Sequence, residues 1–156
     1  MTTALLAASA VVLNGLLAGL LFAFVCAVSP AYRRLSDEEF VRGFRAVNEA
    51  ILRPSFLVVF FGAPLTALAA AVVGSVETGT VPLLWVGAAG SLGSLIITMT
   101  VNVPLNTRLV RARIETAADC AAARTGFEAR WNRWNLIRCW ASVVAALGFA
   151  LALALG

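Results

Sequence analysis

Four long apolar runs determine what this chain of 156 residues can fold into. They span about residues 4–28, 55–76, 81–101 and 136–155. Each approaches or exceeds the roughly 20 apolar residues with which a helix crosses a bilayer. Only 13% of the residues are charged, against about 25% in a soluble domain. The sequence therefore predicts an all-α protein, a membrane four-helix bundle that forms one domain over residues 1–156.

The arginines fall in two of the three connections between these runs. All of them lie within residues 29–54 and 102–138, and the chain contains no lysine. Because basic residues accumulate on the cytoplasmic side, we expect both connections in the cytoplasm and both termini outside, in a bacterial cell membrane. A signal peptide is the alternative for the first run, but that run is too long and lacks a charged leading region. With a net charge of +4, we then expect the basic residues to contact anionic lipid headgroups rather than nucleic acid.

Shorter helices are expected in both arginine-rich connections. Ser36 and Glu39 fit a capping box, and residues 40, 44, 47 and 51 place apolar side chains on one helical face. This pattern predicts a short amphipathic cytoplasmic helix along or under the membrane. Residues 107–129 predict a helical cytoplasmic extension with its charges on a solvated face. Ser29 and Pro30 are expected to end the first span, because proline disfavours helical geometry in the residue before it.

Polar side chains form a stripe on each of the last two spans. Their spacing of three or four residues puts them on one face of each helix. The stripe on the third span comprises Ser91, Ser94, Thr98 and Asn102, and Asn106 continues it by one turn if Pro104 does not redirect the helix. The stripe on the fourth span comprises Trp131, Asn135, Arg138 and Ser142. Hydrogen bonding between helices explains the serines and Thr98 well, but not an arginine and several asparagines gathered at one depth.

The chemistry open to these residues is limited by what the sequence lacks. There is no histidine, and Cys26, Cys120 and Cys139 lack metal-like spacing, so we expect free thiols and no metal site. No phosphate loop or nucleophilic triad is present. Arginine, asparagine and tryptophan side chains supply a positive charge, hydrogen-bond donors and aromatic walls, a set that stabilises an oxyanion or enolate in a low-dielectric pocket. A ligand pocket and a purely structural polar layer both remain open at this point.

Four sequence pieces resemble the anthrone-oxygenase-like family of small four-helix membrane proteins. They are Gly-Leu-Leu-Ala-Gly at 15–19, Ala-Val-Asn-Glu-Ala-Ile-Leu-Arg-Pro-Ser-Phe at 46–56, Asn-Val-Pro-Leu-Asn-Thr-Arg-Leu at 102–109 and Trp-Asn-Arg-Trp-Asn-Leu-Ile-Arg at 131–138. The resemblance covers nearly the whole chain. The Asn-x-Pro-Leu-Asn and Trp-x-x-x-Asn-x-x-Arg pieces are fairly specific for the family, most of whose members have no known function.

The resemblance implies oxidation of an anthrone to an anthraquinone with molecular oxygen as co-substrate, without metal or flavin, in aromatic polyketide biosynthesis. On this basis we expect Arg138 to face the substrate anion, with hydrogen bonds from Asn102, Asn106 and Asn135. Trp131 would stack on the rings and Asn48 would close the pocket. We place Thr98, Ser142 and Arg130 in the same substrate-binding set.

A general base is the missing part, because no carboxylate lies within the two stripes and Glu49 is only the nearest acid to a motif residue. Two alternatives to an oxygenase therefore stay open. One is a membrane binding or carrier protein for a small lipophilic anion. The other is an accessory scaffold subunit, in which Gly15 and Gly19 let helix backbones pack closely. The expected partners are the bilayer and a small aromatic substrate, and a homo-oligomer is left open.

Overall fold

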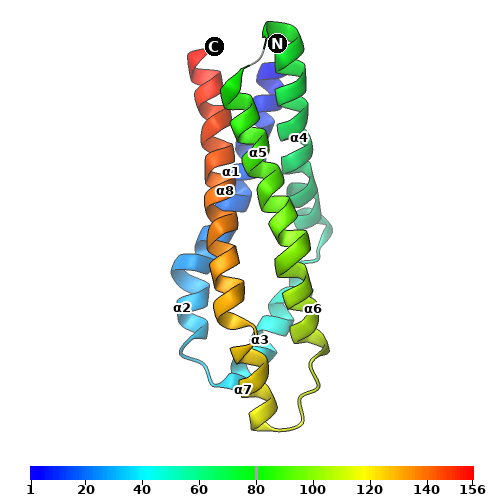
Figure 1. Ribbon diagram of the computed structural model, residues 1–156, viewed down its shortest axis with the longest axis vertical. Coiled ribbons are helices and arrows are strands. Elements are labelled where there is room, and N and C mark those ends of the chain that lie inside the picture. Colours follow the sequence, from blue (N-terminus) through cyan, green and yellow to red (C-terminus); the bar gives the residue numbers. More distant parts are fainter. Residues whose placement is uncertain (80) are drawn as a thin grey trace.

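The computed structural model describes residues 1–79 and 81–156, and within these ranges every regular element is helical (Figure 1). Four helical rods are long and apolar enough to cross a membrane, namely Thr2–Tyr32, Pro54–Glu77, Pro82–Arg111 and Ala117–Leu155. They stand side by side with both termini at one end (Figure 1). The predicted all-α bundle of an integral membrane protein is confirmed.

The rods are divided into shorter elements. The first contains α1 (Thr2–Ala23), the π-helical segment η1 (Phe24–Val28) and α2 (Ser29–Tyr32). The amphipathic α3 (Asp37–Ala50) leads to the uninterrupted α4 (Pro54–Thr78). The third rod contains α5 (Pro82–Ile97), the π-helical segment η2 (Thr98–Asn102) and α6 (Val103–Arg111), and the chain ends with α7 (Ala117–Thr125) and α8 (Glu128–Leu155).

Both π-helical segments precede a proline by the same spacing. Segment η1 ends two residues before Pro30, and η2 ends two residues before Pro104. Proline in a helix removes a hydrogen bond and clashes with the preceding turn, and a wider turn relieves that clash. The prediction that Ser29 and Pro30 end the first span is therefore wrong, because the helix continues to Tyr32. Pro104 likewise leaves the third rod continuous to Arg111.

The half of the bundle that contains the termini is closely packed. Its core is mostly alanine from α1, α4 and α5, closed by Phe149 of α8. Helices α5 and α8 approach so closely that a Cβ on Gly90 would lie 2.7 Å from the carbonyl oxygen of Ala141. A Cβ on Gly15 or Gly19 would meet nothing within 4 Å. The glycine pair noted in the sequence therefore does not serve close packing within this chain.

Helix α3 lies across the other end of the bundle and is held by its apolar face. Ser36 and Glu39 form the predicted capping box, and hydrogen bonds from the side chain and backbone of Ser36 hold the pKa of Glu39 below its usual value. Phe40 and Phe44 are buried in an aromatic cluster with Phe127. The amphipathic helix predicted from the apolar spacing is thus confirmed.

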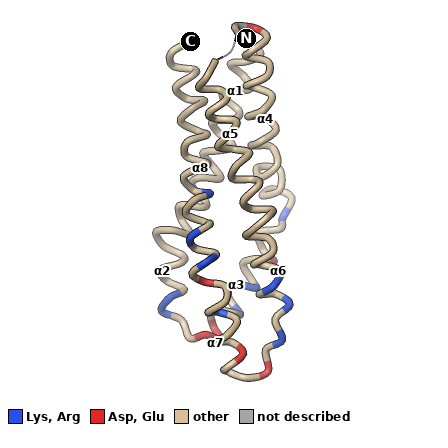
Figure 2. Tube along the Cα trace, viewed as in Figure 1, with Lys and Arg blue, Asp and Glu red and all other residues tan. Residues whose placement is uncertain are grey.

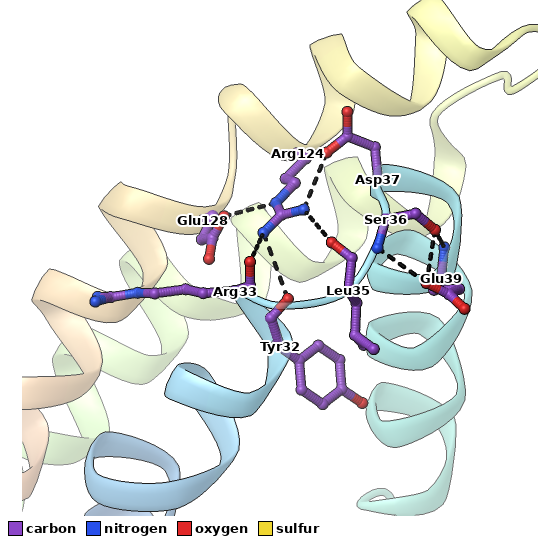
Figure 3. Close-up of polar contacts among 8 residues, drawn as sticks. All are labelled: Tyr32, Arg33, Leu35, Ser36, Asp37, Glu39, Arg124 and Glu128. Atoms are coloured by element: carbon purple, nitrogen blue, oxygen red, sulfur yellow. Dashed lines mark hydrogen bonds and ion pairs between the residues drawn. The ribbon is translucent and has the colours of Figure 1, made fainter.

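Arg124 of α7 fixes the turn that precedes α3 (Figure 3). Its guanidinium donates to the carbonyl oxygens of three residues in the turn, Tyr32, Arg33 and Leu35. It also pairs with Asp37 at 3.0 Å and with Glu128 at 2.7 Å. The expectation that the charges of residues 107–129 form a solvated face is therefore wrong for Arg124, whose side chain is only 14% exposed.

The charged residues gather at the end of the molecule that contains α3, α6 and α7 (Figure 2). The half that contains both termini is almost entirely uncharged (Figure 2). This separation follows from the sequence, because all twelve basic residues lie in the two connections at that end or in the adjoining turns of the spans. The candidate site lies where the charged end joins the apolar half.

Candidate functional site

A cavity of about 330 Å³ lies between α1, α3, α4, the α5–η2–α6 rod and α8. Its volume falls in the range of small-molecule pockets, roughly 300–1,000 Å³. Most of its wall is apolar, and α1 and α4 supply nearly half of the apolar lining residues. Its polar lining consists of Asn48, Ser94, Thr98, Asn102, Asn106, Thr107, Asn135 and Arg138, with Trp131 beside them. Seven of the nine predicted site residues therefore border one cavity.

The two π-helical segments both contribute to this wall. Phe24 of η1 and three residues of η2, namely Thr98, Met99 and Asn102, line the cavity. A π-helical turn changes the direction of the side chains after it and is frequent at functional sites. In the third rod, Asn102 and Asn106 both line the cavity, because they lie four residues apart at the start of the regular helix α6. The side chains that the helical spacing placed on one stripe thus stay together past the proline.

Arg138 is the buried cation of the site. Its Nη1 donates to Thr98 Oγ1 at 3.0 Å, and its Nη2 donates to Asn135 Oδ1 at 2.9 Å. The Nε of Arg138 is buried and has no hydrogen-bond partner in residues 1–79 and 81–156. Among the described residues no carboxylate forms an ion pair with this guanidinium. A buried charge is costly unless it is compensated, so the cavity is electrostatically suited to an anion or a strongly polarised oxygen.

Hydrogen bonds beyond Arg138 hold the charge in place. Thr98 Oγ1 donates to the carbonyl oxygen of Ser94 at 2.8 Å. Asn135 Nδ2 donates to the carbonyl oxygen of Leu21 at 3.2 Å. Arg138 is therefore fixed through Thr98 to the third rod and through Asn135 to α1. This arrangement orients the guanidinium before any ligand binds.

Asn102 differs from the other asparagines of the cavity. Its side chain is only 1% exposed, yet neither Nδ2 nor Oδ1 has a hydrogen-bond partner within the described part of the chain. Leaving a buried polar group unpaired costs about 1–3 kcal/mol. Because Asn102 borders the cavity, a ligand that accepts one hydrogen bond and donates another would satisfy both atoms.

Trp131 closes the cavity toward the charged end. Its indole Nε1 donates to Asn106 Oδ1 at 2.8 Å, so Asn106 holds the indole in place. The ring packs against Phe24, Phe44 and Phe127, with centroid distances of 5.4, 4.9 and 6.1 Å. Arg138 Cζ lies 5.6 Å from the Trp131 ring centroid. The indole is therefore both a wall of the cavity and a neighbour of the cation.

Two predicted site residues lie outside this group. Arg130 is exposed and does not line the cavity, because it precedes Trp131 by one residue and points to another side of α8. Ser142 is fully buried one turn beyond Arg138, where its hydroxyl donates to Ser94 Oγ at 3.1 Å. Ser142 thus joins α8 to α5 and does not border the cavity.

The sequence stripes did not identify the apolar wall. Phe56, Phe60 and Phe61 of α4 border the cavity, but that helix is hydrophobic throughout and gives no signal for one face. Thr107 was also missed, although it follows Asn106 directly. Glu49 is exposed and outside the lining. Within the described residues, no carboxylate borders the cavity.

The family model of the anthrone oxygenases matches residues 55–148. This segment contains α5, α6, most of α4 and the part of α8 that borders the cavity, but it excludes α1 and α3. Neither the curated proteins nor the solved structures include a match to the chain. Since the matched segment is more than half of the chain and contains Asn102, Asn106, Trp131, Asn135 and Arg138, this protein belongs to the anthrone oxygenase family, as its sequence motifs predicted.

Proposed function

We propose that this protein is a cofactor-independent membrane oxygenase that oxidises a polycyclic aromatic substrate of the anthrone type with molecular oxygen. Family membership supports an oxygenase-like role. The observation that carries the proposal is Arg138, a buried cation that borders an apolar cavity and has no acidic partner among the residues that the structure describes. A flat aromatic anion matches both the charge and the walls of that cavity.

The proposed reaction needs little from the protein beyond binding and electrostatics. Loss of a proton from the methylene carbon of an anthrone gives an electron-rich anion whose charge rests mainly on oxygen. Arg138 stabilises that oxygen, and the carboxamide of Asn102 supplies a hydrogen bond to it. The anion reduces molecular oxygen, one oxygen atom becomes the new carbonyl, and the other leaves as water. Anthrone and one oxygen molecule thus balance one anthraquinone and one water.

Removal of the proton is the step for which the described cavity lining offers no carboxylate base. In the proposal, the substrate ionises to solvent before or during binding, and the cation of Arg138 favours the ionised form. Trp131, Phe24 of η1 and Phe60 of α4 are buried cavity residues that exclude water from the anion. Exclusion of water strengthens the interaction between the guanidinium and the developing charge.

Oxygen consumption tests this function directly. Purified protein in detergent, treated with a chelator, is given anthrone, and the rate is compared with autoxidation in the same detergent. Arg138→Gln should remove most of the excess rate, whereas Arg133→Gln should retain it, because Arg133 is exposed and outside the cavity. Formation of anthraquinone is followed by mass spectrometry. An unmodified protein with no excess rate would overturn the proposal for this substrate.

A second function is favoured by the lack of a carboxylate among the described cavity residues. The same cation and apolar walls suit a membrane protein that binds or carries a lipophilic anion without converting it. Saturable binding of anthrone without any product would identify this alternative. Product formation above autoxidation would exclude it.

A further inference from the structure

We infer that the ligand enters the cavity sideways from the bilayer, through an opening between the first half of α4 and the η2–α6 segment. The inference rests on the proposed function only in that the occupant is lipophilic. It assigns the role of an entrance to apolar residues that line the cavity. Phe61 and Met99 flank the proposed opening.

Exposure distinguishes the apolar opening of the cavity from its polar end. Phe61 and Leu52 on the α4 side are 45% and 62% exposed, although both line the cavity. Met99 and Val103 on the opposite side are 49% and 39% exposed, and they line it as well. The polar group at the inner end is buried, with Arg138 only 7% exposed. The cavity therefore has a closed polar end and an open apolar side.

Helix packing explains why the opening lies at this place. Helix α4 packs extensively on α1 and α5, whereas η2 packs on α5, α6 and α8, and α6 also packs on α3. The α5–α6 rod continues past the start of α4 toward the charged end (Figure 1). Between the α4–α5 contact and the charged end, the rod of α4 and the rod of α5–α6 therefore pack on different neighbours. The cavity wall is left apolar and exposed between them.

The charged end offers a less favourable route. There the cavity is bounded by Trp131 and Phe44, whose rings pack edge to face at 4.9 Å. Helix α3 is held over this end by Arg45, which donates to the carbonyl oxygens of Leu109 at 3.0 Å and Ala112 at 2.6 Å. Entry from water would require these contacts to open. Entry from the bilayer would pass between the exposed side chains of Phe61 and Met99 and would leave these contacts intact.

Binding kinetics test the route, because a group at an entrance changes association and release together while leaving affinity unchanged. The probe is 1,8-dihydroxyanthraquinone, delivered from vesicles to protein in nanodiscs and followed by quenching of tryptophan fluorescence. Phe61→Trp and Met99→Trp should slow both rates by about tenfold with little change in Kd. Met99→Ala, a smaller side chain, should accelerate both. Val58→Trp and Leu65→Trp are matched controls, because both positions are exposed on α4 but lie outside the cavity.

The outcomes separate this inference from the proposed function. Saturable binding with unaltered rates in Phe61→Trp, Met99→Trp and Met99→Ala would overturn the entry route alone. A weaker affinity with an unaltered association rate would also overturn it, since the residues would then be contacts of the bound ligand. If the unmodified protein does not bind the probe saturably, the proposed function and the route both fail.

Discussion

The carboxamide of Asn102 is proposed to bind the ligand, but it lowers the stability of the folded protein. Both of its polar atoms are buried and unpaired, which disfavours the folded protein. We expect Asn102→Leu to leave the free energy of unfolding unchanged or to raise it by about 1–3 kcal/mol, because the unpaired group is removed. The same substitution should abolish saturable binding of an anthrone. Thermal unfolding in detergent and binding to the same preparation measure the two effects.

Asn14 provides the control for this substitution. It is also fully buried with an unpaired Oδ1, but it lies outside the cavity and its Nδ2 donates to the carbonyl oxygen of Ala10. Asn14→Leu should therefore leave binding intact. If Asn102→Leu destabilised the protein and bound anthrone normally, the carboxamide would have only a structural role.

Arg138 should set the pH dependence of turnover through the substrate. A cation within about 4–6 Å of an ionising oxygen lowers the pKa of that oxygen by about 1–3 units. The rate at saturating anthrone should rise with pH as the bound substrate ionises. In Arg138→Gln the neutral side chain no longer favours the anion, so the midpoint should move to higher pH by about 1–3 units. Identical midpoints in the two proteins would show that the guanidinium does not act on the ionising group.

Helical spacing predicted most of the candidate site at this scale. It grouped Thr98 and Asn102 on one rod with Asn135 and Arg138 on the other, and all four border one cavity. It could not predict which polar atoms stay unpaired, because that depends on neighbours from α1 and α4. Arg130 precedes the motif directly, but neighbouring residues on a helix point in different directions, so Arg130 is exposed and does not line the cavity.

Among the elements, apolar length predicted the four rods, while the π-helical segments were missed. A proline within an apolar run indicates either a helix end or a local distortion, and the sequence does not distinguish the two. The structure has the distortion at both Pro30 and Pro104. The amphipathic helix α3 was predicted well because its capping box and apolar spacing are local signals.

Close packing of α5 on α8 predicts a large difference between two neighbouring glycines. Gly90→Ala would place a Cβ 2.7 Å from the carbonyl oxygen of Ala141 and 3.2 Å from the backbone nitrogen of Ala145. Because the backbone of α8 must shift, we expect a loss of about 1–3 kcal/mol in unfolding free energy. A Cβ on Gly93 of the same helix meets nothing within 4 Å. Gly93→Ala should therefore be neutral or stabilise by up to about 1 kcal/mol.

Unfolding of both variants in mixed detergent micelles measures this difference. Equal stabilities would mean that α5 and α8 do not approach as closely as the structure has them. The comparison also bears on the predicted pattern at Gly15 and Gly19, where added methyl groups meet nothing within this chain. Close packing in this bundle thus uses glycines that the sequence pattern alone did not single out.

At the scale of the whole molecule, the separation of charge predicts the orientation of the protein in its membrane. Charged residues gather at the end opposite the termini (Figure 2). Because basic residues accumulate on the cytoplasmic side of membrane proteins, we expect this end in the cytoplasm. Cysteine labelling tests this in a Cys26→Ser background, because Cys26 is exposed while Cys120 and Cys139 are buried. An impermeant maleimide on intact cells should label Gly156→Cys.

Glu115→Cys is the matched position at the other end, since the Glu115 side chain is 61% exposed. It should be labelled only after the cells are permeabilised. Labelling of Glu115→Cys but not Gly156→Cys on intact cells would reverse the orientation. With the expected orientation, the cavity lies at the depth of the inner leaflet, because it is bounded by α3 and the cytoplasmic halves of α5–α6 and α8. A lipophilic substrate made in the cytoplasm would then reach the proposed opening from the leaflet that it enters first.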